Sequence, residues 1–76
     1  MFDPVSFGRR LRQSREKANL TAKQVEALIY ISQSVISRYE SGNVEPTIGR
    51  VFTLANLYGC SVDWLLGREE AQHEHC

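Results

Sequence analysis

The sequence predicts an all-α fold, a five-helix orthogonal bundle, on three observations. Start and stop signals for helices recur at short intervals along the 76 residues, and the alternating apolar pattern of a β-strand is absent. The connections between the expected helices are only a few residues long, which favours an orthogonal bundle over a coiled coil. A hydrophobic fraction of 42% and a charged fraction of 24% are ordinary for a globular domain, so a disordered chain is disfavoured.

The first helix is expected over residues 4–18. Asp3 provides an N-cap, and Pro4 occupies the first helical position, where its missing N–H has no helical partner to lose. Asn19 ends the helix, because its short amide tolerates the left-handed conformation of a helix C-terminus. The face expected to be buried carries residues at helical spacing, which are Phe7, Leu11, Ser14 and Ala18.

The second, fourth and fifth helices have equally clear ends. Thr21 and Gln24 have the spacing of a capping box before a helix over residues 22–29, whose apolar face consists of Val25, Leu28 and Ile29. A fourth helix opens at Pro46-Thr47 and closes at Gly59. Its residues spaced for burial are Ile48, Val51, Phe52, Leu54, Ala55 and Tyr58. Ser61 caps a last helix, Val62 to Leu66, which stops at Gly67.

The third helix, over residues 33–41, has an unusual composition. It begins after Ser32 and ends at Gly42, and its apolar side chains form one narrow stripe of Val35, Ile36 and Tyr39. The other face carries hydrogen-bonding groups, mostly short ones, which are Gln33, Ser34, Ser37, Arg38 and Ser41. With the second helix and the turn at Tyr30-Ile31-Ser32, it forms a helix-turn-helix candidate whose polar face would read base edges in the DNA major groove.

The net charge is zero, but the charges are unevenly distributed. Residues 1–23 hold six basic and two acidic side chains, a balance of +4, and residues 62–76 hold one basic and four acidic side chains, a balance of −3. A molecule with one basic end can present a positive face to phosphates. Charges scattered over a solvated helix would give the same count, so the charge alone does not decide the function.

Other functional classes are disfavoured. The longest apolar run, from Leu28 to Ile31, is too short to span a membrane, and the N-terminus lacks the apolar region of a secretory signal, so a cytoplasmic protein is expected. No nucleophile elbow or phosphate-binding loop is present, so we expect neither an enzyme nor a cofactor. Cys60 and Cys76 have no ligand spacing and are expected to be reduced thiols. The tail His73-Glu74-His75-Cys76 has nothing around it to fix ligands, so no metal site is expected there.

Four segments carry a resemblance to a known family: FGRRLRQSREKANLT, ISQSVISRYESG, EPTIGRVFTLANLYG and CSVDWLLG. From Phe7 to Gly67 the chain resembles the lambda-repressor-like (Cro/CI-type) helix-turn-helix family of prokaryotic and phage regulators. The resemblance implies a DNA-binding domain over residues 1–67, followed by a polar tail over residues 68–76. It implies a transcriptional regulator that binds double-stranded operator DNA as a homodimer, with repression as the expected mode. The alternative is a protein-interaction module of the same fold, such as an antitoxin or the partner of an anti-repressor, which the zero net charge favours.

The family pattern also implies roles for individual residues. Base contacts are implied for Gln33, Ser34, Ser37 and Arg38. Phosphate contacts are implied for Thr21, Ala22, Lys23 and Asn43, where the backbone N–H groups of a helix N-terminus suit an anion even without a polar side chain. Arg15 and Glu40 are expected to form an internal ion pair between the first and third helices, although Glu40 as a solvated residue near a helix end is the alternative.

The sequence departs from the family pattern at three positions. Tyr30 replaces the usual glycine of the turn and would have to adopt a positive φ, unless the turn takes another shape. Glu26 replaces a small residue and lies near the entry to the third helix. Its carboxylate would accept hydrogen bonds from the free N–H groups at the start of that helix. Ser14 replaces a core leucine and is expected beneath larger neighbours such as Tyr39.

Dimerisation through the last helix is expected, because one such domain reads too few base pairs to select a site in a genome. This helix has more apolar side chains than one face can bury. We expect Trp64 and Leu66 to point inward and Val62 and Leu65 to form an exposed or interfacial edge, with Cys60 nearby. The alternative is that Val62 and Leu65 merely cover the fourth helix.

Overall fold

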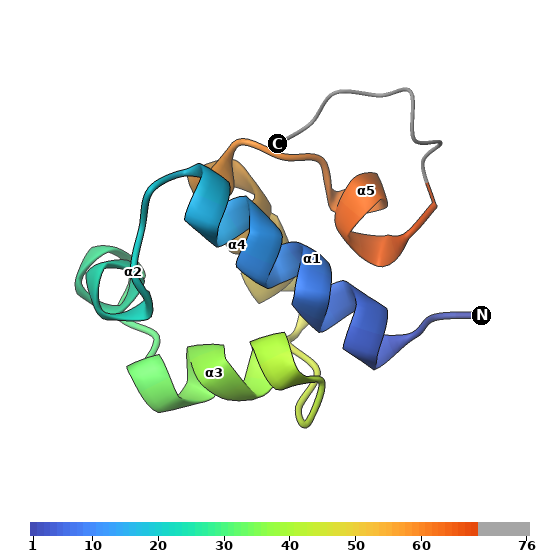
Figure 1. Ribbon diagram of the computed structural model, residues 1–76, viewed down its shortest axis with the longest axis horizontal. Helices are drawn as coiled ribbons and strands as arrows, with labels where there is room; N and C mark the ends of the chain where they lie inside the picture. Colours follow the sequence, from blue (N-terminus) through green and yellow to red (C-terminus); the bar gives the residue numbers. More distant parts are fainter. Residues whose placement is uncertain (69–76) are drawn as a thin grey trace.

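The structure, a computed structural model, describes residues 1–68 and contains five helices and no strand in that range (Figure 1). The helices are α1 (Pro4–Lys17), α2 (Ala22–Ile29), α3 (Gln33–Ser41), α4 (Ile48–Tyr58) and α5 (Val62–Leu66). Helix α1 lies against α3, α4 and α5, and α2 packs against α3 (Figure 1). The predicted all-α fold with five helices is confirmed, whereas the predicted tail lies outside the described residues except for Arg68.

Local capping groups set the helix boundaries. The first residue before each helix accepts a backbone N–H with its side chain, and these N-caps are Asp3, Thr21, Ser32, Thr47 and Ser61. Such a cap stabilises a helix by about 1 kcal/mol, because it satisfies a donor that the helix leaves free. Helices α3, α4 and α5 end at glycines in the left-handed conformation, and Asn19 after α1 has φ 60°, as predicted.

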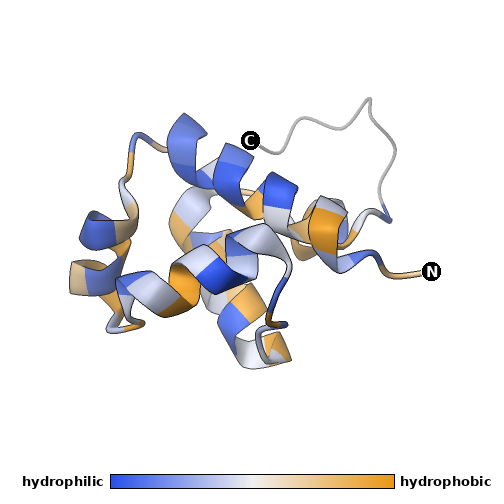
Figure 2. Ribbon diagram, turned by 60° about the horizontal axis from the view of Figure 1, so that its bottom comes forward, coloured by the Kyte–Doolittle hydropathy of each residue, from blue (hydrophilic) through white to orange (hydrophobic). Residues whose placement is uncertain are grey.

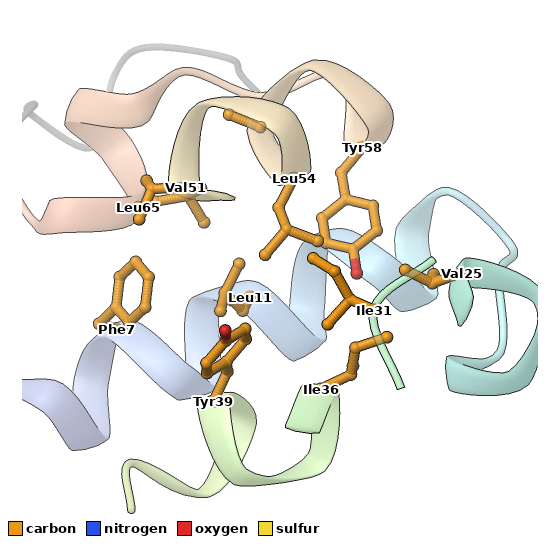
Figure 3. Packing of buried hydrophobic residues seen from close by; sticks show 11 residues of the cluster. Phe7, Leu11, Val25, Ile31, Ile36, Tyr39, Val51, Leu54, Tyr58 and Leu65 are labelled. Atoms are coloured by element: carbon orange, nitrogen blue, oxygen red, sulfur yellow. The ribbon is translucent and has the colours of Figure 1, made fainter. Parts of the chain in front are cut away.

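One apolar core gathers side chains from all five helices (Figure 3). Its buried members are Phe7, Leu11, Val25, Ile31, Ile36, Tyr39, Val51, Leu54, Ala55, Tyr58 and Leu65. Burial of a large apolar side chain contributes about 1.5–3 kcal/mol, so this cluster holds the short helices in place although none of them would be stable alone. Ser14 is buried as well, and its hydroxyl donates to the carbonyl oxygen of Arg10 at 2.8 Å.

The close approach of α1 and α3 depends on Gly8. A Cβ atom at this position would overlap the carbonyl oxygen of Glu40 and would lie 2.6 Å from that of Tyr39. The two backbones are therefore closer than any side chain on α1 would allow. Sequence analysis did not single out Gly8, although an isolated glycine inside a helical pattern is a signal of close packing.

The predicted burial of α4 was partly wrong. Ile48 and Phe52 are 72% and 59% exposed, although both have helical spacing with the core residues. They lie four residues apart, on a stripe beside the buried face that meets α1 and α5, and no described element covers that stripe. On α2, Leu28 is likewise exposed, because the helix is anchored through Val25.

The predicted orientation of α5 was also wrong. Leu65, expected at an exposed edge, is fully buried, and Trp64 and Leu66, expected to point inward, are only half-buried. Leu65 lies next to Val51 in the core (Figure 3). The Trp64 ring lies at the surface of α1, with the Arg10 guanidinium 5.8 Å from the ring centroid. Since α5 has only five residues, its apolar pattern was too short to define one face.

Membrane insertion of the described part would need a long apolar helix. Within residues 1–68, no helix has the length and hydropathy required to cross a bilayer.

Candidate nucleic-acid interface

A tight turn joins α2 to α3. Tyr30 adopts the left-handed conformation, with φ 60° and ψ 33°, and its N–H donates to the carbonyl oxygen of Glu26 at 2.9 Å. The next residue, Ile31, is buried in the core, and Ser32 then caps α3 through the N–H of Val35 at 3.2 Å. The turn therefore has the shape that a glycine would normally provide, with a tyrosine in its place. Ser32, and not Glu26, caps the start of α3, and within residues 1–68 the structure shows no hydrogen bond from α3 to the Glu26 carboxylate, so that expectation was wrong.

The exposed face of α3 holds all four side chains that were expected to contact bases. Gln33, Ser34, Ser37 and Arg38 are exposed, whereas Ile36 and Tyr39 on the opposite face are buried. Helix α3 lies along the lower edge of the molecule in Figure 1 and at the front in Figure 2, so no other helix covers this face. The arrangement presents amide, hydroxyl and guanidinium groups on one outer surface. These are groups that hydrogen-bond base edges in the major groove.

The residues expected to contact phosphates lie before and after α3 along the chain, at the start of α2 and in the loop after α3. Thr21 and Lys23 are exposed and Ala22 is half-buried at the first turn of α2. Thr21 forms the capping box with Gln24. The Thr21 hydroxyl accepts the backbone N–H of Gln24 at 3.1 Å, and the backbone N–H of Thr21 donates to the Gln24 side-chain oxygen at 2.9 Å. Asn43 lies in the loop after α3 and is exposed, and its N–H donates to the carbonyl oxygen of Arg38 at 3.0 Å.

A largely buried ion pair ties α3 to α1. Arg15 donates from Nε to one carboxylate oxygen of Glu40 at 2.7 Å and from Nη2 to the other at 3.1 Å, and the side chains are 13% and 11% exposed. Its Nη1 also donates to the carbonyl oxygen of Leu20 at 2.9 Å. The hydrogen bonds that Arg15 donates to the Glu40 carboxylate raise the pKa of the Arg15 guanidinium. The pair predicted from the sequence is present, and its bidentate geometry fixes the orientation of α3.

A second bond holds α3 against α4, and sequence analysis missed it. The Arg50 Nη1 donates to the hydroxyl of Tyr39 at 2.6 Å. Tyr39 belongs to the buried stripe of α3, and a buried phenol normally finds a hydrogen-bond partner. The signal for this bond was therefore Tyr39 itself, but the sequence did not indicate which helix would supply the donor.

The residues expected at a dimer interface are not equivalent in the structure. Cys60 and Val62 are half-buried, and the Cys60 thiol lies 3.4 Å from the hydroxyl of Ser14 in α1. Leu65 is fully buried in the core of its own domain, so it cannot contact a second copy without unfolding α5.

Metal ligands do not gather in the described part of the chain. Residues 1–68 contain no group of three or more histidine, cysteine or acidic side chains that could hold an ion. The tail motif His73-Glu74-His75-Cys76 lies outside the described residues.

Comparison with known proteins gives the family. A helix-turn-helix family model matches residues 11–65, most of the chain. The HTH-type transcriptional regulator ImmR of Bacillus subtilis (strain 168) is 34% identical over 71 residues, which cover 93% of this chain and 56% of ImmR. The HTH-type transcriptional regulator DicA of Escherichia coli (strain K12) is 32% identical over 69 residues, which cover 90% of this chain and 51% of DicA. The chain thus spans about half the length of these relatives.

A solved structure agrees with the sequence matches. The P22 c2 repressor protein, in a crystal structure with synthetic operator 9T, superposes with a TM-score of 0.75 at 27% sequence identity. The superposition covers 83% of this chain and 96% of the repressor chain. On the family match over residues 11–65 and this structural similarity, the chain belongs to the Cro/CI-type helix-turn-helix family that its sequence resembles.

Proposed function

We propose that the chain binds double-stranded DNA in a sequence-specific manner, with α3 in the major groove, and regulates transcription. The observation that carries the proposal is the exposed polar face of α3. The Arg15–Glu40 ion pair attaches this helix to α1, and the hydrogen bond between Arg50 and Tyr39 attaches it to α4. A helix that reads base edges has to be held rigidly, and these bonds with the core contacts of α3 provide that support. The named relatives are transcriptional regulators, and the P22 c2 repressor was solved in complex with a synthetic operator.

In this proposal the four exposed side chains Gln33, Ser34, Ser37 and Arg38 of α3 contact bases. Gln33 pairs with the N6 and N7 atoms of an adenine, and Arg38 with O6 and N7 of a guanine. Ser34 and Ser37 add single hydrogen bonds, and their short side chains let the helix backbone come close to the base edges. Phosphate contacts from Thr21, Ala22, Lys23 and Asn43 fix the register on either side of the groove.

We further propose a cytoplasmic repressor that acts as a homodimer and has neither a catalytic activity nor a cofactor. One α3 contacts only a few base pairs, so two-fold pairing of domains about one DNA turn apart, ~34 Å, supplies the missing specificity. Occupancy of promoter DNA by such a dimer would block transcription.

The direct test is selection of bound fragments from a genomic library, followed by affinity measurements at several salt concentrations. We expect Gln33→Ala and Arg38→Ala each to weaken binding to the selected site by ~1–3 kcal/mol without a change in stability. Lys23→Ala should weaken binding to all sequences similarly and lower the salt slope by about one unit, because one phosphate contact is lost.

A matched control for the glutamine variant is Gln13→Ala, which removes an exposed glutamine from α1 instead of α3. It should leave the affinity for the selected site unchanged. If Gln33→Ala and Arg38→Ala bound this site as the wild type does, the assignment of base readers would be wrong.

The second candidate function is a protein-interaction module of the same fold. The zero net charge favours it, because most DNA-binding domains have a basic surface. In that case the same selection would enrich no sequence, and the variants on α3 would leave DNA retention unchanged.

A further inference from the structure

Tyr30, in the turn between α2 and α3, has a side chain that makes no specific contact within the described part of the protein. It is 90% exposed. Within residues 1–68, its ring stacks with no other aromatic ring or guanidinium group, and its hydroxyl makes no hydrogen bond. Its φ of 60° is a backbone conformation that an L side chain disfavours. Residues held in such a conformation are concentrated at functional sites, which points to a partner outside the chain.

The turn directs the Tyr30 side chain outward. Ile31 is 6% exposed and belongs to the core, whereas Tyr30 and Ser32 on either side of it are exposed. The Ser32 hydroxyl accepts the N–H of Val35 as the N-cap of α3. The Tyr30 hydroxyl has no such partner within residues 1–68, so the turn presents an unpaired phenol at the surface.

This phenol lies close to the end of α3 that is proposed to enter the major groove. Tyr30 precedes Gln33, the first residue of α3, by three positions, so their Cα atoms are at most about 11 Å apart. Figure 1 shows the turn at the left end of α3 and the loop after α3 at its right end. Tyr30 and Asn43 therefore lie beyond opposite ends of the helix.

We infer that the Tyr30 hydroxyl donates a hydrogen bond to a phosphate of the DNA backbone, at the wall of the groove that α3 enters. The inference rests on the proposed function. The major groove is about 12 Å wide, so a residue within about 11 Å of a base-reading side chain, but outside the helix, lies near a phosphate wall. Tyrosine side chains are among the groups that hydrogen-bond phosphate oxygens.

The position and the chemistry favour a phosphate over a base edge. The base edges form the floor of the groove, which is contacted by the N-terminal side chains of the recognition helix itself. Tyr30 comes before the N-cap Ser32, and the axis of α3 continues away from it. A phosphate also offers only acceptors, which match the unpaired O–H donor of the phenol.

The contact adds an uncharged member to the proposed phosphate-binding residues. Lys23 at the start of α2 would contribute a positive charge, which releases a counterion from the DNA. A phenol contributes no positive charge and releases none. Its hydrogen bond would instead fix the register of the neighbouring Gln33 on its base pair, because phosphate contacts position a helix on the duplex.

Tyr30→Phe is the direct test, because it keeps the Cβ atom and the ring and removes only the hydroxyl. We expect it to bind the selected DNA site about tenfold more weakly, since one hydrogen bond to a charged group is lost. The loss should be the same at every salt concentration, unlike that of Lys23→Ala. Urea unfolding should give the stability of the wild type, because the hydroxyl makes no bond within residues 1–68.

Two further variants separate the contact from the stability of the fold. Tyr30→Gly relieves the strain of the turn, so it should be more stable than the wild type and yet bind the site at least as weakly as Tyr30→Phe. A purely structural role would change stability and affinity in the same direction. The matched control is Thr53→Val, which removes an exposed hydroxyl from α4, a helix outside the proposed DNA-binding face. It should bind as the wild type does.

A methylphosphonate scan of the selected site locates the phosphate. Each substitution replaces one charged phosphate oxygen by a methyl group, and the wild type should bind more weakly wherever it contacts that phosphate. For Tyr30→Phe, one of these positions should no longer matter, because the phosphate and the hydroxyl act as a pair. This phosphate should lie beside the base pair at which Gln33→Ala relaxes the sequence preference.

The outcomes separate this inference from the proposed function. If the wild type selected a site and Tyr30→Phe bound it equally well, the phosphate contact would be overturned while the proposed function stood. A scan in which Tyr30→Phe and the wild type respond to the same phosphates would also overturn the contact. If the wild type selected no DNA sequence, the proposed function and the contact would fail together.

Discussion

At the scale of single residues, Tyr30 has a backbone conformation that its residue type disfavours. Its φ of 60° costs an ordinary residue roughly 1–2 kcal/mol relative to glycine, and its side chain is 90% exposed, so no burial offsets the strain. The turn keeps this shape because Ile31 on one side is buried and the Tyr30 N–H closes α2. The fold, and not the preference of the residue, therefore determines the conformation.

Replacement of Tyr30 by glycine should stabilise the protein. We expect Tyr30→Gly to raise the free energy of unfolding by about 0.5–1 kcal/mol, which is the strain relieved less the greater entropy of glycine in the unfolded chain. Urea unfolding measures the change. Tyr30→Ala is the control, because alanine loses the ring but retains the Cβ atom that causes the strain. Equal stability of the glycine and alanine variants would contradict this explanation.

Gly8 determines how two elements meet. Because a Cβ atom there would overlap the carbonyl oxygen of Glu40, α3 would have to move away from α1 in a Gly8→Ala variant. We expect a loss of at least about 1–3 kcal/mol, the usual cost of overpacking, despite the better helix propensity of alanine. A domain of this size would then melt roughly 4–8 °C lower for each kcal/mol lost.

A second helical glycine provides the matched control. Gly49 lies in the first turn of α4, and a Cβ atom there would have nothing within 4 Å. Gly49→Ala should therefore stabilise the protein by about 0.5–1 kcal/mol, the intrinsic preference for alanine in a helix. Thermal unfolding of both variants by circular dichroism is sufficient, and shifts of the same sign would show that backbone contact at Gly8 is not what matters.

The helix ends were predictable from the sequence because each is determined by a few adjacent residues. Capping side chains, the left-handed Asn19 and the terminal glycines act within one turn, so sequence and structure agree there. The Arg15–Glu40 pair was predictable only through the family resemblance, since 25 positions separate the two residues. Propensity alone does not bring them together.

The exposure of apolar side chains was harder to predict. Ile48 and Phe52 fit the same helical period as the core residues, and only the absence of a neighbouring element leaves them exposed. In α5 the rotation of five residues is determined by the preceding connection, and Leu65 instead of Trp64 became the core residue. Both errors concern how elements are arranged around one another, which a local pattern does not contain.

At the scale of the whole molecule, α3 contributes both to the proposed DNA-binding face and to the hydrophobic core. Tyr39 and Ile36 belong to the core, and Glu40, which follows Tyr39 on α3, is bound to Arg15 of α1, so α3 cannot move without disturbing the whole cluster. A domain this small has a single core and should unfold in one cooperative step. Any change in the core is therefore expected to affect global stability and DNA binding together.

Tyr58 makes the stability of the folded domain depend on pH. Burial raises the pKa of its phenol, and the nearby Glu40 carboxylate adds to the shift, so the folded state favours the neutral form. An unfolded tyrosine ionises near pH ~10. The stabilisation of the folded state by the neutral phenol is therefore complete below about pH 10 and is lost as the pH rises further, by up to about 1.4 kcal/mol per pH unit. Urea unfolding between pH 8 and pH 11 measures the slope. In Tyr58→Phe, which keeps the buried ring but has no ionisable group, this part of the alkaline loss should disappear, and an unchanged slope would show that other groups cause it.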